Sequence, residues 1–142
     1  MSFMGINVWS VLAAAAATMV IGFVWYSPFL FATPWVKLMG YDMNDKAKID
    51  ELKKGAGAMY GLAFVGSVLA ASILEKIVHI SSGHSILNGV KIGLAIWVGC
   101  VTTVQLTDSI FGRKPAKLYL INTGYQLVCF VVMGAIVAAW PR

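Results

Sequence analysis

Four long runs of apolar residues occupy most of this chain, and they constrain its fold more than any other feature. The runs cover residues 6–31, 56–77, 86–107 and 118–140. A helix of about 20 apolar residues crosses the roughly 30 Å hydrocarbon core of a bilayer. The sequence therefore predicts an all-α integral membrane bundle of four transmembrane helices, forming a single membrane domain over residues 1–142.

The composition agrees with a membrane-embedded chain. Hydrophobic residues make up 59% of the sequence and charged residues only 12%, whereas soluble domains carry about 25% charged residues. The net charge of +5 does not indicate nucleic-acid binding, because no basic run is interleaved with aromatic residues. The basic side chains lie at the ends of the apolar runs, so we expect membrane lipids as partners and no nucleic acid.

The distribution of basic residues predicts the orientation of the helices. Eight of the 11 Lys and Arg residues fall in the connections after the first and third runs, and three fall on the opposite side. Positive charge marks the cytoplasmic side of a membrane protein. We therefore expect both termini on the non-cytoplasmic side, and we interpret the first run as a retained helix because Met1–Trp9 contains no Lys or Arg.

Small residues spaced four apart recur in every run, and this spacing places them on one face of each helix. Such faces let two helices approach closely, which is a main source of helix association in lipid. The predicted packing residues are Ser10, Ala14, Thr18 and Gly22 in the first run, Gly57 and Gly61 in the second, Gly89 and Gly93 in the third, and Gly134 in the fourth. Any such face that the bundle does not use is available to a partner or a second copy.

Two further features belong to the junction between the first and second runs. The first run ends in Trp25-Tyr26-Ser27-Pro28, and Pro28 is expected to kink or end the helix because proline lacks a backbone N–H. Residues 42–54 combine apolar positions with lysines and carboxylates. This pattern is typical of a short amphipathic helix at the membrane interface.

The densest polar cluster lies where the third run ends and the fourth begins. Its members are Gln105, Asp108, Asn122, Tyr125 and Gln126. Polar side chains at membrane depth are costly, so they normally face the bundle interior and find partners. One interpretation is a polar pocket with Asp108 as a proton- or cation-responsive carboxylate. The other is interhelical hydrogen bonding, with an interfacial Asp108 that meets Arg113 or Lys114.

Reactive and metal-binding side chains are few. His79 and His84 occupy a short connection without a third ligand, and Cys100 and Cys129 fall near the middles of the third and fourth runs. We interpret the cysteines as small buried apolar residues, or as a redox pair if the two helices are neighbours. No catalytic triad, phosphate-binding loop or zinc-protease motif is present. The sequence therefore predicts a protein that is not an enzyme and has no metal and no cofactor.

The segment from Gly22 to Gly40 and the end of the chain resemble the DUF1761 family of small, mostly bacterial membrane proteins. The most specific part is Trp25-Tyr26-Ser27-Pro28, followed by Phe31 and Trp35, and the final helix adds Asn122, Gly124-Tyr125 and Trp140. The resemblance implies a four-helix protein of unknown function in a bacterial inner (plasma) membrane. It also draws attention to Trp25, Tyr26, Ser27, Pro28 and Trp35 as an interfacial aromatic wall opposite Asn122 and Tyr125.

Three functional hypotheses follow. The leading one is a non-enzymatic structural or accessory protein that associates through its small-residue faces, as a homo-oligomer or as a subunit of a larger membrane complex. The second is an oligomeric small transporter or channel with a polar site near Asp108. The third is a protein that binds a lipid or another apolar ligand in a groove lined by Trp25, Tyr26 and Trp97.

Overall fold

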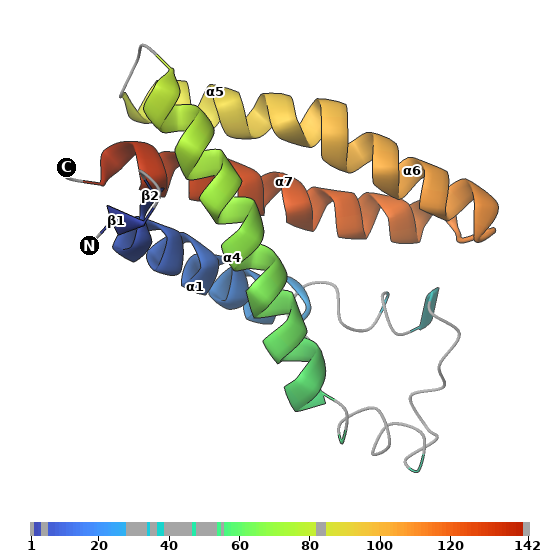
Figure 1. Cartoon of the computed structure of the whole chain (residues 1–142). Coiled ribbons are helices and arrows are strands. Elements are labelled where there is room, and N and C mark those ends of the chain that lie inside the picture. Colours follow the sequence, from blue (N-terminus) through green and yellow to red (C-terminus); the bar gives the residue numbers. More distant parts are fainter. Residues whose placement is uncertain are drawn as a thin grey trace.

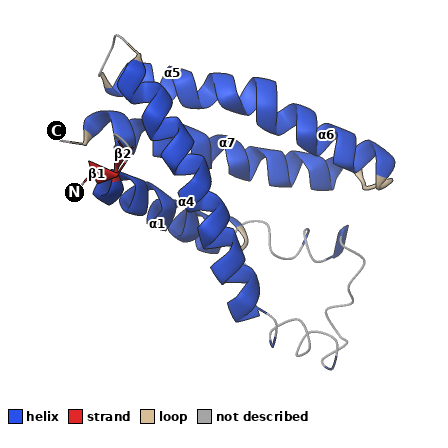
Figure 2. Cartoon of the chain, viewed as in Figure 1, coloured by secondary structure: helices blue, strands red, loops and turns tan. Residues whose placement is uncertain are grey.

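The computed structural model describes residues 2–3, 6–27, 56–81 and 85–140, together with the single positions 34, 37, 38, 47 and 54. The elements are two short strands, β1 (Ser2–Phe3) and β2 (Ile6–Asn7), the helices α1 (Val8–Trp25), α4 (Ala56–Ile80) and α5 (Ile86–Ile96), the π-helical turn η1 (Trp97–Val101), and the helices α6 (Thr102–Phe111) and α7 (Ala116–Ala139) (Figure 2). The helix expected over residues 42–54 lies outside the described residues.

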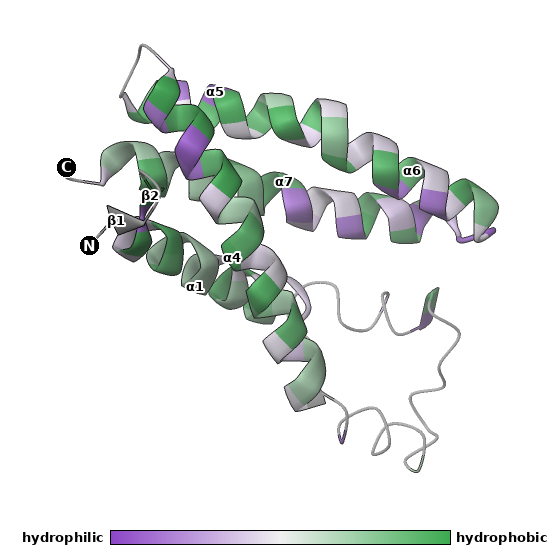
Figure 3. Cartoon of the chain, in the orientation of Figure 1, coloured by the Kyte–Doolittle hydropathy of each residue, from purple (hydrophilic) through white to green (hydrophobic). Residues whose placement is uncertain are grey.

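Four helical segments are long and apolar enough to cross a membrane, as the sequence predicts. They are Val8–Trp25, Gly57–Ile80, Ile86–Phe111 and Ala116–Ala139. Hydrophobic residues run along the length of all four (Figure 3). A helix suits this environment because it satisfies its own backbone hydrogen bonds, which lipid cannot do.

The first helix is shorter than the apolar run that encodes it. Ile6–Asn7 pairs antiparallel with Ser2–Phe3, so the helix begins at Val8 rather than at Ile6. The Asn7 side chain caps it, since Asn7 Oδ1 accepts hydrogen bonds from the backbone N–H groups of Trp9 and Ser10 at 3.1 and 3.3 Å. Asparagine is a strong N-cap because its side chain replaces a missing helical acceptor.

The helices α5–α6 and α7 form an antiparallel pair, α1 packs beside α7, and α4 crosses α1 and α7 obliquely (Figure 1). The start of α1, the end of α4, the start of α5 and the end of α7 lie at one end of the bundle. The turn between α6 and α7 lies at the other end. This end also holds three exposed basic residues, Arg113, Lys114 and Lys117.

Backbone-to-backbone contact joins α5 to α7 through glycine. A Cβ built on Gly93 would lie 2.9 Å from the carbonyl carbon of Phe130, and one built on Gly134 would lie 2.9 Å from that of Gly89. A Cβ on Gly89 would lie 2.6 Å from the Cβ of Ala138. Real Cβ atoms do not approach this closely, so this interface requires glycine at three positions.

The core lies where α1, α4 and α7 meet. Its apolar side chains include Val11, Ala14, Ala71, Leu74, Val78, Cys129, Met133 and Val137. Ser10, Ala14 and Thr18, predicted as one packing face of α1, are all buried. The α4 residues Gly57 and Gly61 are different, because they are exposed and a Cβ on either would meet no atom within 4 Å. The first half of α4 thus presents its small-residue face away from the rest of the described bundle.

Candidate functional site

The end of α1 is hydrogen-bonded to the first turns of α7. The Trp25 indole Nε1 donates to the backbone oxygen of Ile121 at 3.1 Å. Tyr26 Oη donates to Asn122 Oδ1 at 2.7 Å. The predicted aromatic wall therefore does face Asn122, although Ser27 only bonds back to the Val24 carbonyl of its own helix. Pro28 and Trp35 lie outside the described residues.

Tyr125 lies at the centre of this region. Its Oη donates to the backbone oxygen of Thr18 at 3.0 Å, and its ring packs against that of Tyr26 with centroids 5.3 Å apart. The ring fits because Gly22 has no side chain, since a Cβ there would lie 3.1 Å from Tyr125 Oη. The Thr18 and Ser67 hydroxyls share a hydrogen bond of 2.9 Å. Hydrogen bonds thus join α7 to α1 and α1 to α4.

Two adjoining cavities form a cleft between α1, α4 and α7, with Ala63 and Tyr125 in both linings. The outer cavity, about 260 Å³, has an aromatic lining that includes Met19, Phe23, Tyr26 and Tyr60. The inner cavity, about 280 Å³, is lined by Thr18, Ser67, Gln126, Cys129 and Met133, among others. The cleft is therefore apolar and aromatic at one end and carries a few polar side chains in a mostly apolar lining at the other.

The mouth of the cleft lies at the surface between α1 and α4. The exposed rings of Phe23 and Tyr60 contact each other there, with centroids 5.4 Å apart. Both residues belong to helices that are apolar enough to cross a membrane. The mouth of the cleft therefore lies on a face formed by two candidate membrane-spanning helices.

Asp108 lies apart from this cleft. Its carboxylate Oδ2 is 2.6 Å from Lys114 Nζ, and both side chains are exposed, with 66% and 42% of their surface accessible. Asp108 pairs with Lys114, which lies before the start of α7 at Ala116. Asn122 lies six residues, or about 9 Å, into that helix. This matches the second of the two sequence interpretations, in which Asp108 is interfacial and meets a neighbouring cation.

The predicted polar set thus divides. Asn122, Tyr125 and Gln126 lie at or in the cleft, and Asp108 lies at the α6–α7 turn. Gln105 is half-buried on α6, and its Oε1 is enclosed without a hydrogen-bond partner in the described part of the chain. The structure does not bring Asp108 together with Asn122 and Tyr125.

The exposure of the Asp108–Lys114 pair gives a prediction. Replacing Asp108 by asparagine is expected to change the free energy of unfolding by less than about 1 kcal/mol, because exposed ion pairs contribute little. Unfolding of the purified protein in mild detergent measures this, and Lys114→Gln should give a change of similar size. A loss of several kcal/mol would show instead that Asp108 has a buried partner.

The groove predicted from Trp25, Tyr26 and Trp97 is only partly formed, because Tyr26 lines the cleft and Trp25 and Trp97 are not among its described lining residues. Trp97 Nε1 instead donates to the backbone oxygen of Thr123 at 2.8 Å from within the π-helical turn η1, and no residue pattern signals that turn. Glu75 is fully buried on α4; a carboxylate inside an apolar run was the available signal. Cys129 is buried in the core and Cys100 is exposed on η1, and both thiols are free. The structure therefore does not form the redox pair that was left open.

These features together define a small polytopic membrane protein with a lateral cleft. Residues 9–138 match a family described as "Protein of unknown function (DUF1761)". The chain belongs to that family, which covers nearly its whole length, and the resemblance in its Trp25-Tyr26-Ser27-Pro28 segment is confirmed. No curated protein and no solved structure matches the chain.

Proposed function

We propose that this protein is a non-enzymatic membrane protein that binds a small amphiphilic molecule, such as a lipid, in the cleft between α1, α4 and α7. The observation that carries the proposal is the pair of adjoining cavities, one lined by aromatic rings and the other by apolar residues with the polar side chains of Thr18, Ser67 and Gln126. Cavities of about 260 and 280 Å³, joined at Ala63, approach the volume of small-molecule sites, which are mostly apolar with a few polar groups.

Hydrogen bonding inside the cleft favours a ligand with one polar end. Tyr125 and Tyr26 are engaged with Thr18 and Asn122, so they form fixed walls. The Gln126 amide lines the inner cavity and makes no hydrogen bond with another described residue. It offers a donor and an acceptor to a hydroxyl, carbonyl or amide, while the rings of Phe23 and Tyr60 suit an apolar body.

The groups around the cleft support binding rather than chemistry. None of the described residues that line the two cavities is a His, Asp, Glu or Lys, the types that most often serve as general acid or base. The Thr18 and Ser67 hydroxyls bond to each other, that of Tyr125 bonds to a backbone oxygen, and that of Tyr26 bonds to the Asn122 amide oxygen. The proposal of a non-enzymatic role rests on this composition.

Native mass spectrometry of the protein extracted in mild detergent or lipid particles tests the proposal. We expect a bound small molecule of defined mass that survives removal of the detergent, and its extraction would identify the chemical class. A protein that carries nothing beyond a random distribution of bulk lipid would contradict the proposal.

A second candidate role is association through the first half of α4. Gly57 and Gly61 lie on a face with nothing from the described chain within 4 Å of them, beside exposed Met59 and Leu62. Small residues at this spacing favour close helix contact in lipid. This observation favours a homo-oligomer or a larger membrane complex, in which the protein acts as a structural or accessory subunit.

Replacing Gly61 by leucine should therefore reduce the mass of the native assembly to that of the monomer. The stability of the monomer should remain unchanged, because a Cβ at this position meets no described atom within 4 Å. Gly99→Leu on η1 is the matched control, since a Cβ at Gly99 also meets nothing within 4 Å. An assembly of unaltered mass in Gly61→Leu would exclude this face as the interface.

A transporter or channel with Asp108 in its polar site is less favoured, because Asp108 pairs with Lys114 at an exposed end of the bundle. We further propose a bacterial inner membrane location with both termini on the non-cytoplasmic side. The cluster of Arg113, Lys114 and Lys117 at the opposite end supports this orientation.

A further inference from the structure

The turn between α6 and α7 contains an arginine in an unusual backbone conformation. Among the described residues Arg113 is the one non-glycine with a positive φ, at 52°. The backbone N–H of Lys114 bonds to the Ser109 oxygen at 3.0 Å, and that of Arg113 bonds to the Ile110 oxygen at 3.2 Å. This is the Schellman arrangement, in which the residue at position 113 is usually glycine because a Cβ is unfavourable there.

Gly112 directly precedes this position, yet it has an ordinary φ of −79° and does not use its conformational freedom. The chain therefore places a large cationic side chain where glycine would be more stable. Such an outlier directs attention to what the side chain does. Arg113 lines a surface cavity of about 330 Å³ between the end of α6 and the start of α7.

The cavity joins an apolar wall to a cationic rim. Leu106, Ile110 and Tyr119 form the wall, and Arg113 and Lys114 form the rim. Asp108 pairs with Lys114, whereas Arg113 and Lys117 have no ion pair among the described residues. Residues 108–117 hold three cations and one anion, which is a net charge of +2.

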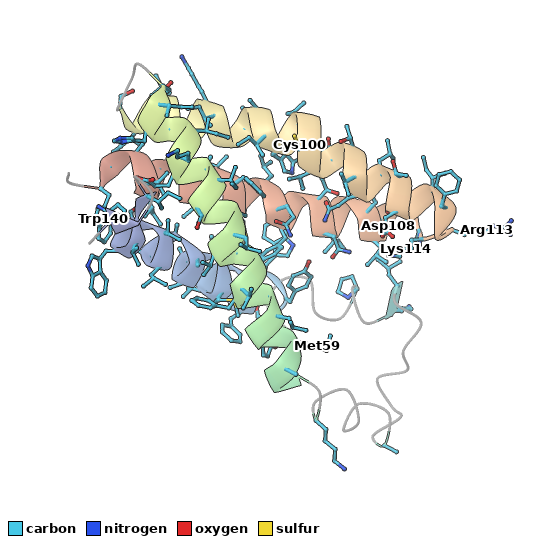
Figure 4. All side chains as sticks on the ribbon, viewed as in Figure 1. Met59, Cys100, Asp108, Arg113, Lys114 and Trp140 are labelled. Atoms are coloured by element: carbon cyan, nitrogen blue, oxygen red, sulfur yellow. The ribbon has the colours of Figure 1, made fainter. Side chains whose placement is uncertain are left out.

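The depth of the turn matches the lipid headgroup layer. The segment Ile86–Phe111 has 26 residues, or about 39 Å of helix, which exceeds a hydrocarbon core of roughly 30 Å. Trp25 bonds to Ile121 at the level where α1 ends. The start of α7 at Ala116 lies five residues, or about 7.5 Å, further out, and Lys114 precedes it. Figure 4 shows Asp108, Arg113 and Lys114 together at this end of the bundle.

We propose that the α6–α7 turn binds the phosphodiester headgroup of an anionic membrane lipid. Arg113 holds the phosphate, because a planar guanidinium donates paired hydrogen bonds to phosphate oxygens. Lys114 on the same rim adds attraction, and the acyl chains lie along Leu106, Ile110 and Tyr119. The apolar wall favours a lipid over a soluble anion, which has nothing to place there. This surface is separate from the cleft and goes beyond the proposed function.

Native mass spectrometry with added lipid tests the proposal. The purified full-length protein is titrated with phosphatidylglycerol, with phosphatidylcholine and with soluble glycerol phosphate. We expect phosphatidylglycerol to bind more tightly than phosphatidylcholine, and glycerol phosphate to compete only weakly. Equal binding of the two lipids, or strong competition by glycerol phosphate, would overturn the assignment to an anionic lipid.

The informative variant is Arg113→Gly. It is expected to weaken phosphatidylglycerol binding about tenfold, the effect of losing one charge-assisted contact. The same variant should raise the thermal unfolding midpoint by about 2–5 °C, because glycine suits the left-handed conformation. If Arg113→Gly binds the lipid more weakly and is also more stable than the wild type, misfolding does not account for the weaker binding.

Two further variants complete the test. Arg113→Gln keeps a polar side chain with a Cβ at the left-handed position and removes the charge, so it should lose binding without the gain in stability. Lys91→Gln, on the exposed face of α5 toward the other end of the bundle, should bind as the wild type does. Undiminished phosphatidylglycerol binding in Arg113→Gly or Arg113→Gln would refute the proposal, whatever the unfolding temperature.

Discussion

Replacing Gly134 by leucine is expected to prevent α5 from packing on α7. A Cβ at this position would lie 2.9 Å from the carbonyl carbon of Gly89, and the neighbouring group is backbone that cannot rotate away. Overpacking in a core typically costs about 1–3 kcal/mol. We expect a loss at or above the upper end of that range. Thermal unfolding in mild detergent, followed by size-exclusion chromatography, measures it.

Gly93→Leu should behave in the same way, since a Cβ there meets the Phe130 backbone. Gly99→Leu on the adjoining η1 turn is the matched control, because its added side chain meets no atom of the chain within 4 Å. A Gly134→Leu protein that unfolds at the wild-type temperature would show that α5 and α7 do not make this backbone contact.

Replacing Ala63 by phenylalanine is expected to fill the cleft and displace its ligand. Ala63 lines both cavities, and the outer one encloses only about 260 Å³. A phenyl ring at this point occupies the junction through which an amphiphile would pass. The amount of co-purifying small molecule should fall to about a tenth of the wild-type amount or less, which corresponds to about 1.4 kcal/mol. Native mass spectrometry of both proteins gives the ratio.

The control for this experiment is Ala95→Phe, which adds the same ring to an exposed position on α5. Both variants should fold, because Ala63 is itself exposed and borders empty space rather than packed side chains. Retention of the bound molecule by Ala63→Phe at the wild-type amount would place the ligand elsewhere. Loss in both variants would indicate a general effect of the added aromatic surface.

The cleft and the lipid surface are separable by these variants. Ala63→Phe should leave phosphatidylglycerol binding at the α6–α7 turn unaltered, and Arg113→Gly should leave the cleft ligand in place. Trp25 and Ile121 mark the level between the two regions. Each proposal therefore stands or fails by its own measurement.

The four-helix architecture was predictable because in lipid each spanning segment must satisfy its own backbone hydrogen bonds. Length and apolarity alone therefore identify the helices. Their ends were less predictable, since they depend on local capping. Asn7 caps α1, which begins at Val8 rather than at Ile6. The third span continues past residue 107 to Phe111, where the turn at Gly112 and Arg113 follows.

Part of the candidate site was also predictable. The sequence places Trp25 and Tyr26 at the end of the first span, and Asn122 and Tyr125 near the start of the fourth. The two spans between them cross the membrane in opposite directions, so these two helix ends lie on the same side. The structure joins Tyr26 to Asn122. Asp108 was not assignable in this way, because one additional helical turn moved it out to the level of Lys114.

By itself, the sequence determined that this chain has four membrane-spanning helices, which face of each carries small residues, and where the charges lie along them. Only the tertiary structure decided which faces meet. Gly89 and Gly134 form a backbone contact, whereas a Cβ on Gly57 or Gly61, which have the same spacing, meets no described atom within 4 Å. Spacing along one helix fixes the direction of a face, but the partner depends on how the helices cross. The same crossing creates the cleft, whose lining residues come from α1, α4 and α7, so the sequence of a single helix does not predict it.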